Sequence, residues 1–232
     1  MIGGFLKGLR ANGGRVVTRA AADDLQVDAT PKVRTARGLF EGDHIVLAGG
    51  AWSARLAARL GLHRPVTVLQ RHLLSAHTHA LSAPTHPYCW LDDLDVYARP
   101  EAAGWLISPC DETRVEPVHG AGPVDPVYRA WAIDKLERHM PALADVTFTG
   151  GWTGLRTFAE DRRPILGPDP EVPGLHWATA LGGFGVTCAF GAGEAVAALV
   201  RGVSPQWLDV EAVAPGRQMP FSLLPKAPGL AL

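Results

Sequence analysis

Residues 178–202 read ATALGGFGVTCAFGAGEAVAALVRG, and this stretch decides the fold of the chain. With the two residues before it, it predicts a buried strand at residues 176–180, a glycine-rich turn at residues 182–185 and a helix at residues 186–200, with Gly202 beyond the helix end. Glycines between a strand and a helix let a ligand come close to the backbone, and the helix start offers unpaired N–H groups and a partial positive charge. From this segment alone, a site for an electron-rich ligand and a glycine-lined packing turn are both open interpretations.

A second strand, glycine turn and helix occur earlier in the chain. The apolar run HIVLA at residues 44–48 is typical of a buried strand, and Gly49 and Gly50 follow it directly. Residues 51–60 then read as a helix that ends at Gly61. This order is typical of an α/β fold.

The amino-terminal residues predict further short elements. Residues 5–9 place apolar side chains on one side of a short helix that stops at residues 12–14, so the chain is expected to begin inside an element. The other predicted elements of this part are strands at residues 15–18, 25–30 and 32–39 and a turn at residues 41–43.

The character of the sequence changes at residue 62. Short β-rich runs broken by prolines, such as TVLQRHLLS, LDVYARP and GWLISP, predict an antiparallel sheet up to about residue 121. A helix at residues 126–140 and a strand at residues 146–150 follow. The predicted parts are residues 1–61, an antiparallel domain at residues 62–148, a second α/β part at residues 149–204, and an irregular, loosely packed tail at residues 205–232.

The composition argues against several classes of partner. The 22 Lys and Arg residues and the 23 Asp and Glu residues leave a net charge of −1, so no basic surface would attract nucleic acid or an anionic membrane. Cys89, Cys110 and Cys188 are odd in number and lack CxxC spacing, which argues against disulfides and zinc and favours a cytoplasmic protein. No uninterrupted run of about 18 apolar residues occurs, so no membrane span is expected.

Common catalytic motifs are missing from the sequence. Gly191, Ala192 and Gly193 begin like a GxGxxG loop, but Val196 takes the sixth position and all four residues fall inside a predicted helix. No GxSxG elbow, Walker loop or HExxH helix occurs, which removes the usual serine hydrolase, P-loop and zincin interpretations.

Five of the nine histidines crowd into one stretch and raise the question of a metal site. They are His63, His72, His77, His79 and His86. His77 and His79 could share one strand face, but no carboxylate or cysteine between them completes a ligand set. Solvated histidines are therefore favoured, and no metal is predicted. Asp92, Asp93 and Asp95 likewise favour a turn over an acid/base pair.

Four stretches, in the same order, resemble the blocks of a known family. They are IVLAGGAWSARLAARLG, VYARPEAAGWLISPCDET, GWTGLRTFAEDRRPILGPDP and LHWATALGGFGVTCAFGAGEAVAALV. They are similar to the D-amino-acid oxidase, glycine and sarcosine oxidase superfamily. SPCDET and GLRTFAEDRRP resemble in particular bacterial D-amino-acid dehydrogenases of the D-arginine type. The resemblance covers residues 1 to about 203.

The resemblance implies an α/β (α+β) chain: a partial FAD/NAD(P)-binding fold interrupted by an antiparallel β-sheet substrate domain, with FAD as cofactor. It puts the flavin ring across the start of the last helix, whose dipole would stabilise negative charge at the N1/C2 carbonyl edge. The cofactor positions it implies are Ala22 near the adenine, then Ala48, Gly49, Gly50 and Trp52, and finally Gly182, Gly183, Phe184, Gly185, Val186 and Thr187.

The resemblance also implies an amino acid as substrate. Arg156 in the GLR block would hold the substrate carboxylate by a bidentate ion pair, Tyr97 would add a hydroxyl, and Arg71 a second guanidinium. Holding the carboxylate places the α-hydrogen over flavin N5, so the expected reaction oxidises the CH–NH group to an imino acid. The expected substrate is a D-amino acid.

The sequence departs from the family pattern at several points. No GxGxxG segment for the pyrophosphate occurs, so the alternative is a truncated, non-catalytic remnant that is inactive alone or needs a partner chain. An exposed sheet edge would favour association, with a partner or as a homo-oligomer. Phe184 stands where relatives often carry His or Tyr, and Thr157 where oxidases often carry Pro, which leaves the substrate and the electron acceptor open. A small-molecule binding module built on the β-rich middle region is a third alternative.

Overall fold

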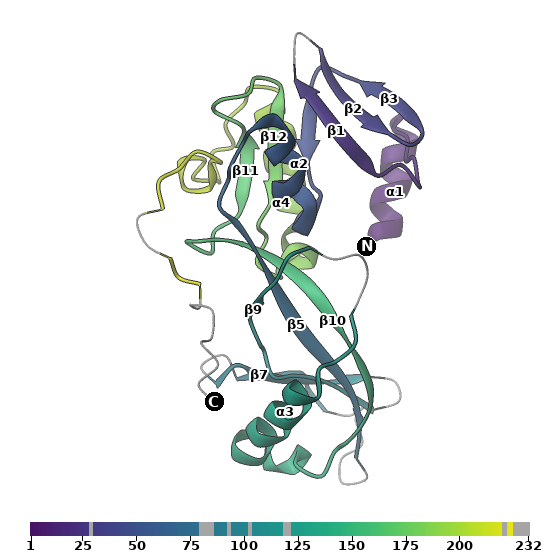
Figure 1. The fold of residues 1–232 in the computed structure, drawn as a ribbon, viewed down its shortest axis with the longest axis vertical. Helices are drawn as coiled ribbons and strands as arrows, with labels where there is room; N and C mark the ends of the chain where they lie inside the picture. Colours follow the sequence, from purple (N-terminus) through teal and green to yellow (C-terminus); the bar gives the residue numbers. More distant parts are fainter. Residues whose placement is uncertain are drawn as a thin grey trace.

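A computed structural model describes residues 1–27, 30–78, 86–91, 94–101, 104–117, 122–219 and 222–224 (Figure 1). The helices are α1 (Ile2–Ala11), α2 (Ser53–Ala57), α3 (Pro126–His139) and α4 (Gly185–Val200), with 3₁₀ turns η1 (Gly50–Trp52), η2 (Ala58–Leu60), η5 (Pro141–Leu143) and η6 (Glu211–Val213). The strands are β1 (Ala22–Val27), β2 (Pro31–Thr35), β3 (Gly38–Glu41), β4 (Ile45–Leu47), β5 (Val66–His77), β6 (Cys89–Leu91), β7 (Val96–Glu101), β8 (Gly104–Ser108), β9 (Thr113–Arg114), β10 (Thr147–Ala159), β11 (Ile165–Pro168) and β12 (Leu175–Thr179). His79, Asp92 and Asp93 lie outside the described residues.

One body of the molecule contains the sheet β11-β12-β4 and helix α4. The two apolar runs of the sequence become the parallel neighbours β4 and β12, with Trp177 opposite Leu47. Continuous apolar strands are typical of a sheet that is buried on both faces. Leu175, His176 and Trp177 of β12 are all buried, whereas Val46 of β4 is 44% exposed, so β12 is covered on both faces and β4 on one. The antiparallel meander β1-β2-β3 lies beside this sheet in the upper part of Figure 1.

The turn between β11 and β12 is organised by one buried carboxylate. Asp169 accepts hydrogen bonds from Arg64 Nε at 3.0 Å and Arg64 Nη2 at 2.8 Å. It also accepts from the backbone N–H of Glu171 and of Val172, and from Trp177 Nε1 at 2.9 Å. Burial alone would raise the pKa of Asp169, but these hydrogen bonds outweigh it and the pKa is lowered.

The other body is an antiparallel sheet with the order β10-β5-β8-β7-β6, and β9 also pairs with β5. Helix α3 covers it, and Leu136 of α3 is fully buried in one cluster with Leu74 and Ile107 of the sheet. The long strands β5 and β10 pair over their whole lengths and run diagonally from this sheet to the body that holds α4 (Figure 1). They therefore join the two bodies.

A bulge in β10 depends on a glycine. The pairing with β5 shifts between Phe148 and Gly150, and Gly151 has φ +155°. A Cβ on Gly151 would lie 2.5 Å from the carbonyl oxygen of Leu73 and 2.8 Å from Val124 Cγ2. Only glycine fits there without a shift of the backbone.

The structure corrects several local predictions. Residues 15–18 form no strand, and residues 32–39 form the end of β2 and the start of β3 around a turn at residues 36–37. The predicted helix at residues 51–60 is the short α2 flanked by two 3₁₀ turns. The strand predicted at residues 146–150 is only the start of β10, which continues to Ala159 by pairing with β5.

The predicted loose packing of the tail is wrong for its described residues. Val213 is buried in one cluster with α4, and Leu224 is buried against Leu69 and Phe158. Arg217 pairs with Asp161 at 2.7 Å. The division into four parts stays a prediction, and β10 runs through its boundary at residue 149.

Candidate active site

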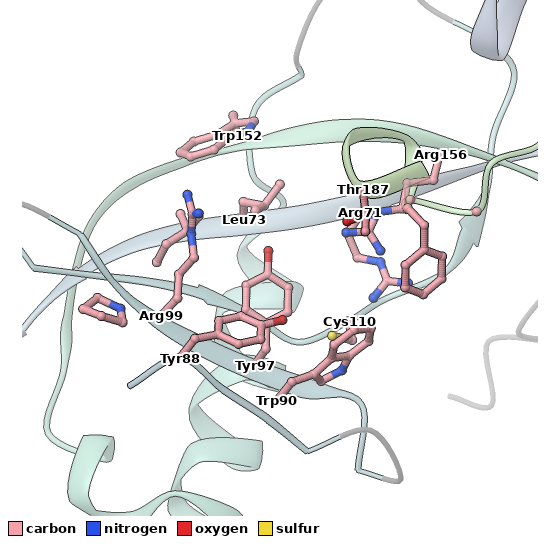
Figure 2. Close-up of a pocket in the computed structure, with 15 residues that line it drawn as sticks. Arg71, Leu73, Tyr88, Trp90, Tyr97, Arg99, Cys110, Trp152, Arg156 and Thr187 are labelled. Atoms are coloured by element: carbon pink, nitrogen blue, oxygen red, sulfur yellow. The ribbon is translucent and has the colours of Figure 1, made fainter. Parts of the chain in front are cut away.

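An open cavity of about 850 Å³ lies where the two bodies meet. Its lining residues are Arg71, Leu73, Tyr88, Trp90, Tyr97, Arg99, Pro100, Leu106, Cys110, Trp152, Arg156, Gly182, Gly183, Phe184 and Thr187 (Figure 2). The structure thus brings the three predicted substrate residues together with the glycine turn before α4. We call this cavity the central pocket.

The register of β5 and β10 places two guanidiniums at the same end of the central pocket. Arg71 on β5 lies opposite Gly154 on β10, and Arg156 is two residues further along. Side chains two residues apart share one face of a strand, so Arg71 and Arg156 are diagonal neighbours. Figure 2 shows both guanidiniums near Thr187, with Arg99 at the other end.

The three arginines of the central pocket differ in their ion pairs. Arg71 Nη2 donates to Glu112 Oε1 at 2.9 Å, and Arg99 pairs with Glu101. Arg156 forms no salt bridge with any acidic residue in the described part of the chain. Arg156 is therefore the pocket cation whose charge is left for a ligand.

The Arg156 side chain packs against the glycine turn. A Cβ on Gly183 would lie 2.8 Å from Cδ, Nε and Cζ of Arg156, so a side chain there would displace the guanidinium. Gly182 and Gly183 have φ +60° and +88°, and Gly182 N–H donates to the carbonyl of Thr157 at 2.9 Å. Burial, followed by the nearby positive charge of Arg71, lowers the pKa of Arg156. An anion bound here would relieve both effects.

Neutral hydrogen-bond donors complete this end of the pocket. Tyr97 on β7 is buried, and burial raises the pKa of its hydroxyl although Arg156 acts in the opposite direction. Burial also raises the pKa of the Cys110 thiol more than Arg71 lowers it. Both groups therefore stay protonated near neutral pH and can donate hydrogen bonds.

The start of α4 can bind an electron-rich ligand through its backbone N–H groups. No side chain caps this helix of 16 residues. Its first turn contributes Thr187 to the central pocket, next to the glycine turn. The unpaired N–H groups of a helix start carry partial positive charge and favour a partner that gains negative charge. The residues present therefore fit the electron-rich ring of the flavin that the sequence blocks imply.

Residues 1–199 match the sequence profile of the DAO family, described as FAD dependent oxidoreductase. The chain belongs to the DAO family. The family resemblance drawn from the four sequence blocks is confirmed, and FAD is the cofactor of this family.

Individual relatives show how much of a DAO-family protein the chain covers. It is 31% identical over 178 residues to an uncharacterized oxidoreductase of Halorhodospira halophila, and the matched region covers 71% of this chain and 74% of that protein. It is 28% identical over 198 residues to a D-amino acid dehydrogenase of Rhodopseudomonas palustris, and the matched region covers 84% of this chain and 44% of that protein.

A solved structure shares the DAO-family fold. The crystal structure of glycine oxidase from Geobacillus kaustophilus superimposes with a TM-score of 0.75 at 22% identity, over 90% of this chain and 55% of that one. The chain therefore spans about half the length of this structure. The predicted fold class, an FAD-binding fold interrupted by an antiparallel sheet, is confirmed.

The other predicted cofactor residues of the DAO-family chain are divided between two places. Ala22, expected near the adenine, and Gly49 and Trp52, expected in a second flavin-facing turn, line a separate cavity of about 490 Å³ beside α2. Ala48, Gly50, Gly185 and Val186 line neither this cavity nor the central pocket. Val186 is instead 73% exposed on α4. The two predicted flavin-facing turns therefore lie at different cavities, and the cofactor roles stay predictions.

The sequence interpretation missed several residues of the central pocket. Tyr88 and Trp90 lie on the three-residue strand β6, which carries too little pattern to be found, and Trp152 follows the bulge in β10. Cys110 stands in the quoted SPCDET block, and so does Glu112, which pairs with the pocket residue Arg71, so that block was the available signal for both.

The described residues of the DAO-family chain show neither a metal-binding cluster nor a membrane-spanning helix. There, no cluster of three or more His, Cys, Asp or Glu residues is arranged to hold a metal ion. Nor does any helix in that part have the length and apolar character needed to cross a membrane.

Proposed function

We propose that this chain acts as an FAD-dependent oxidoreductase on the CH–NH group of an amino acid, most specifically a D-amino acid. The observation that carries the proposal is the position of Arg156. A guanidinium without an acidic partner in the described chain lies against the glycine turn at the uncapped start of α4, in one pocket.

Arg156 would bind the substrate carboxylate, since its planar fork matches the two carboxylate oxygens. Tyr97 would donate its hydroxyl to the same group. Arg71 uses Nη2 for Glu112, which leaves its other N–H groups for the carboxylate. These contacts would fix the substrate at one end and so orient its α-carbon.

When bound, FAD would supply the oxidation by accepting a hydride from the substrate α-carbon. Gly182, Gly183 and Thr187 would hold the ring edge at the start of α4. Gly49 and Trp52 would form a second flavin-facing turn, and Ala22 would contact the adenine end. The product would be an imino acid, which hydrolyses in water to an oxo acid. The protein would contribute mainly orientation and electrostatic stabilisation.

A second candidate function is that of a subunit that is active only with a partner chain. Two observations favour it. Helix α1 has no buried residue, and Val186 and Phe190 on α4 are 73% and 69% exposed. In the described part of the sheet, β4 pairs only with β12, so its other edge is open to a further strand.

Titration with FAD tests the proposal. The purified chain is mixed with FAD, unbound cofactor is removed by gel filtration, and flavin absorbance is followed as D-amino acids are added without oxygen. We expect yellow protein whose flavin absorbance is bleached by a D-amino acid. A colourless chain that oxidises no D-amino acid would refute autonomous activity and support the subunit hypothesis, and the elution volume would then report association.

A further inference from the structure

Glu112 connects a guanidinium inside the central pocket to one at the surface. Its Oε1 accepts from Arg71 Nη2 at 2.9 Å and from Arg162 Nη1 at 3.2 Å, and its Oε2 accepts from Arg162 Nη2 at 2.5 Å. The side chain of Arg71 is 7% exposed, that of Glu112 17% and that of Arg162 38%. The inner ion pair is therefore shielded from water and the outer one is not.

The neighbours of Glu112 hold it in this position. Asp111 is buried, accepts a hydrogen bond from His72 N–H at 2.8 Å, and lies 2.7 Å from His72 Nδ1. Ser108 Oγ donates to the His72 carbonyl at 2.8 Å. Because His72 follows Arg71 on β5, these buried bonds attach the segment before and after Cys110 to the same strand. They therefore fix the backbone next to Glu112 beside Arg71.

This pair changes the charge that a ligand meets. Arg71 and Arg156 are diagonal neighbours at one end of the central pocket, and without Glu112 both positive charges would face the ligand. The charge of Arg162 is partly solvated and therefore screened. Glu112 thus leaves Arg156 as the uncompensated cation at this end, while Arg71 keeps its N–H donors and loses most of its net charge.

We propose that Glu112 is a specificity-determining residue: by compensating Arg71, it makes the pocket select amino acids with one carboxylate over those with two. A second carboxylate would need a second uncompensated cation at this end of the pocket. It would also come close to Glu112, and like charges repel. The inference rests on the proposed function in one respect, since it assigns the substrate carboxylate to Arg156.

The test compares ligands that differ in one carboxylate. Dissociation constants of benzoate and phthalate are measured by the fluorescence of Trp90 and Trp152, which line the pocket, and kcat/KM is measured for D-norvaline and D-glutamate. Two ratios compare the dicarboxylate with the monocarboxylate: the affinity for phthalate over that for benzoate, and kcat/KM for D-glutamate over that for D-norvaline. For Glu112→Gln we expect both ratios to rise at least about tenfold, while the dissociation constant of benzoate changes less than about threefold. A merely structural role would weaken all four ligands together.

Two further variants make the result decisive. Glu171→Gln changes the net charge equally at an exposed side chain that pairs with Arg64, and we expect it to leave the ratios unchanged. Arg162→Gln removes the outer ion pair, so that Glu112 pairs with Arg71 alone and compensates its charge more fully. We therefore expect both ratios to fall about two- to threefold, toward the monocarboxylate. Arg162→Gln alone decides the matter if Glu112→Gln does not fold.

The outcomes separate this inference from the proposed function. Unchanged ratios in both Glu112→Gln and Arg162→Gln would overturn the inference, whereas benzoate binding and oxidation of D-norvaline by the unaltered chain would still support the function. If the unaltered chain binds benzoate but oxidises nothing, the oxidase proposal fails and the ratio of phthalate to benzoate binding still judges Glu112. If it binds neither anion, both proposals fall.

Discussion

At the scale of single residues, the central pocket is organised by which charges have partners. Arg99 is balanced by an exposed carboxylate and Arg71 by a largely buried one, whereas Arg156 packs on a glycine turn with no acidic partner in the described chain. An exposed ion pair contributes little energy, and a buried one fixes both partners. The three arginines should therefore respond very differently to substitution.

We expect Arg156→Ala to lower kcat/KM for a D-amino acid about 10²- to 10³-fold, because a lost bidentate, charge-assisted contact costs about 3–4 kcal/mol. Arg156→Lys keeps the charge but not the fork, so we expect a loss of about tenfold. Arg99→Ala is the matched control and should change kcat/KM less than about threefold. Steady-state kinetics measure all three, and an equal loss in Arg99→Ala would contradict the assignment.

At the scale of elements, the pocket depends on the register of β5 and β10. The bulge between Phe148 and Gly150 determines which residues of β10 face β5 beyond it, and so places Gly154 opposite Arg71. A shift of one residue would move Arg156 to the other face of the strand. Gly150 and Gly151 next to the bulge allow this change of pairing.

The prediction at this scale concerns Gly151. Gly151→Ala puts a Cβ against the Leu73 carbonyl at a backbone conformation that suits glycine, so we expect the free energy of unfolding to fall by about 2–4 kcal/mol. Gly150→Ala is the control, because a Cβ there meets nothing within 4 Å, and we expect a change within about 1 kcal/mol. Urea denaturation of both variants measures this. Similar midpoints would show that the bulge needs no glycine.

At the scale of the whole molecule, two bodies share one continuous strand pair, and the central pocket lies at their junction (Figure 1). Unfolding of the body that holds α4 would therefore also remove the residues that this body contributes to the pocket. His176 is buried in its sheet, its Nδ1 has no hydrogen-bond partner in the described chain, and its ring lies 5.1 Å from that of His44. A charge on this ring would be costly there.

This arrangement predicts a pH-dependent stability. Burial, followed by the charge of His44, lowers the pKa of His176 below its ordinary value of 6.5. Below about pH 6.5 the unfolded chain binds more protons than the folded chain. The protein therefore has its full free energy of unfolding above about pH 6.5, and this free energy falls as the pH drops toward the lowered pKa. We expect His176→Phe to flatten the pH dependence of the melting temperature in this window, and the exposed His63→Gln to leave it unchanged. A parallel slope in His176→Phe would refute the role of this ring.

Local pattern in the sequence determined much of the fold and part of the candidate site. The strand, glycine turn and helix at residues 176–200 and the α3 helix follow from short-range apolar spacing and from residues that end helices, and the structure confirms these elements. The sequence blocks also pointed to Arg156, Tyr97 and Arg71, and the structure gathers these three around one pocket.

Only the tertiary structure decided how those residues meet. The extent of β10, the diagonal placement of Arg71 and Arg156, and the pairing of Arg71 with Glu112, 41 residues away, depend on strand register and on loop paths that no local pattern contains. Likewise the tail, irregular by composition, is held by Arg217 and Val213 through contacts with distant residues. Residue type and spacing specify backbone preference, whereas charge compensation arises only when separate segments pack together.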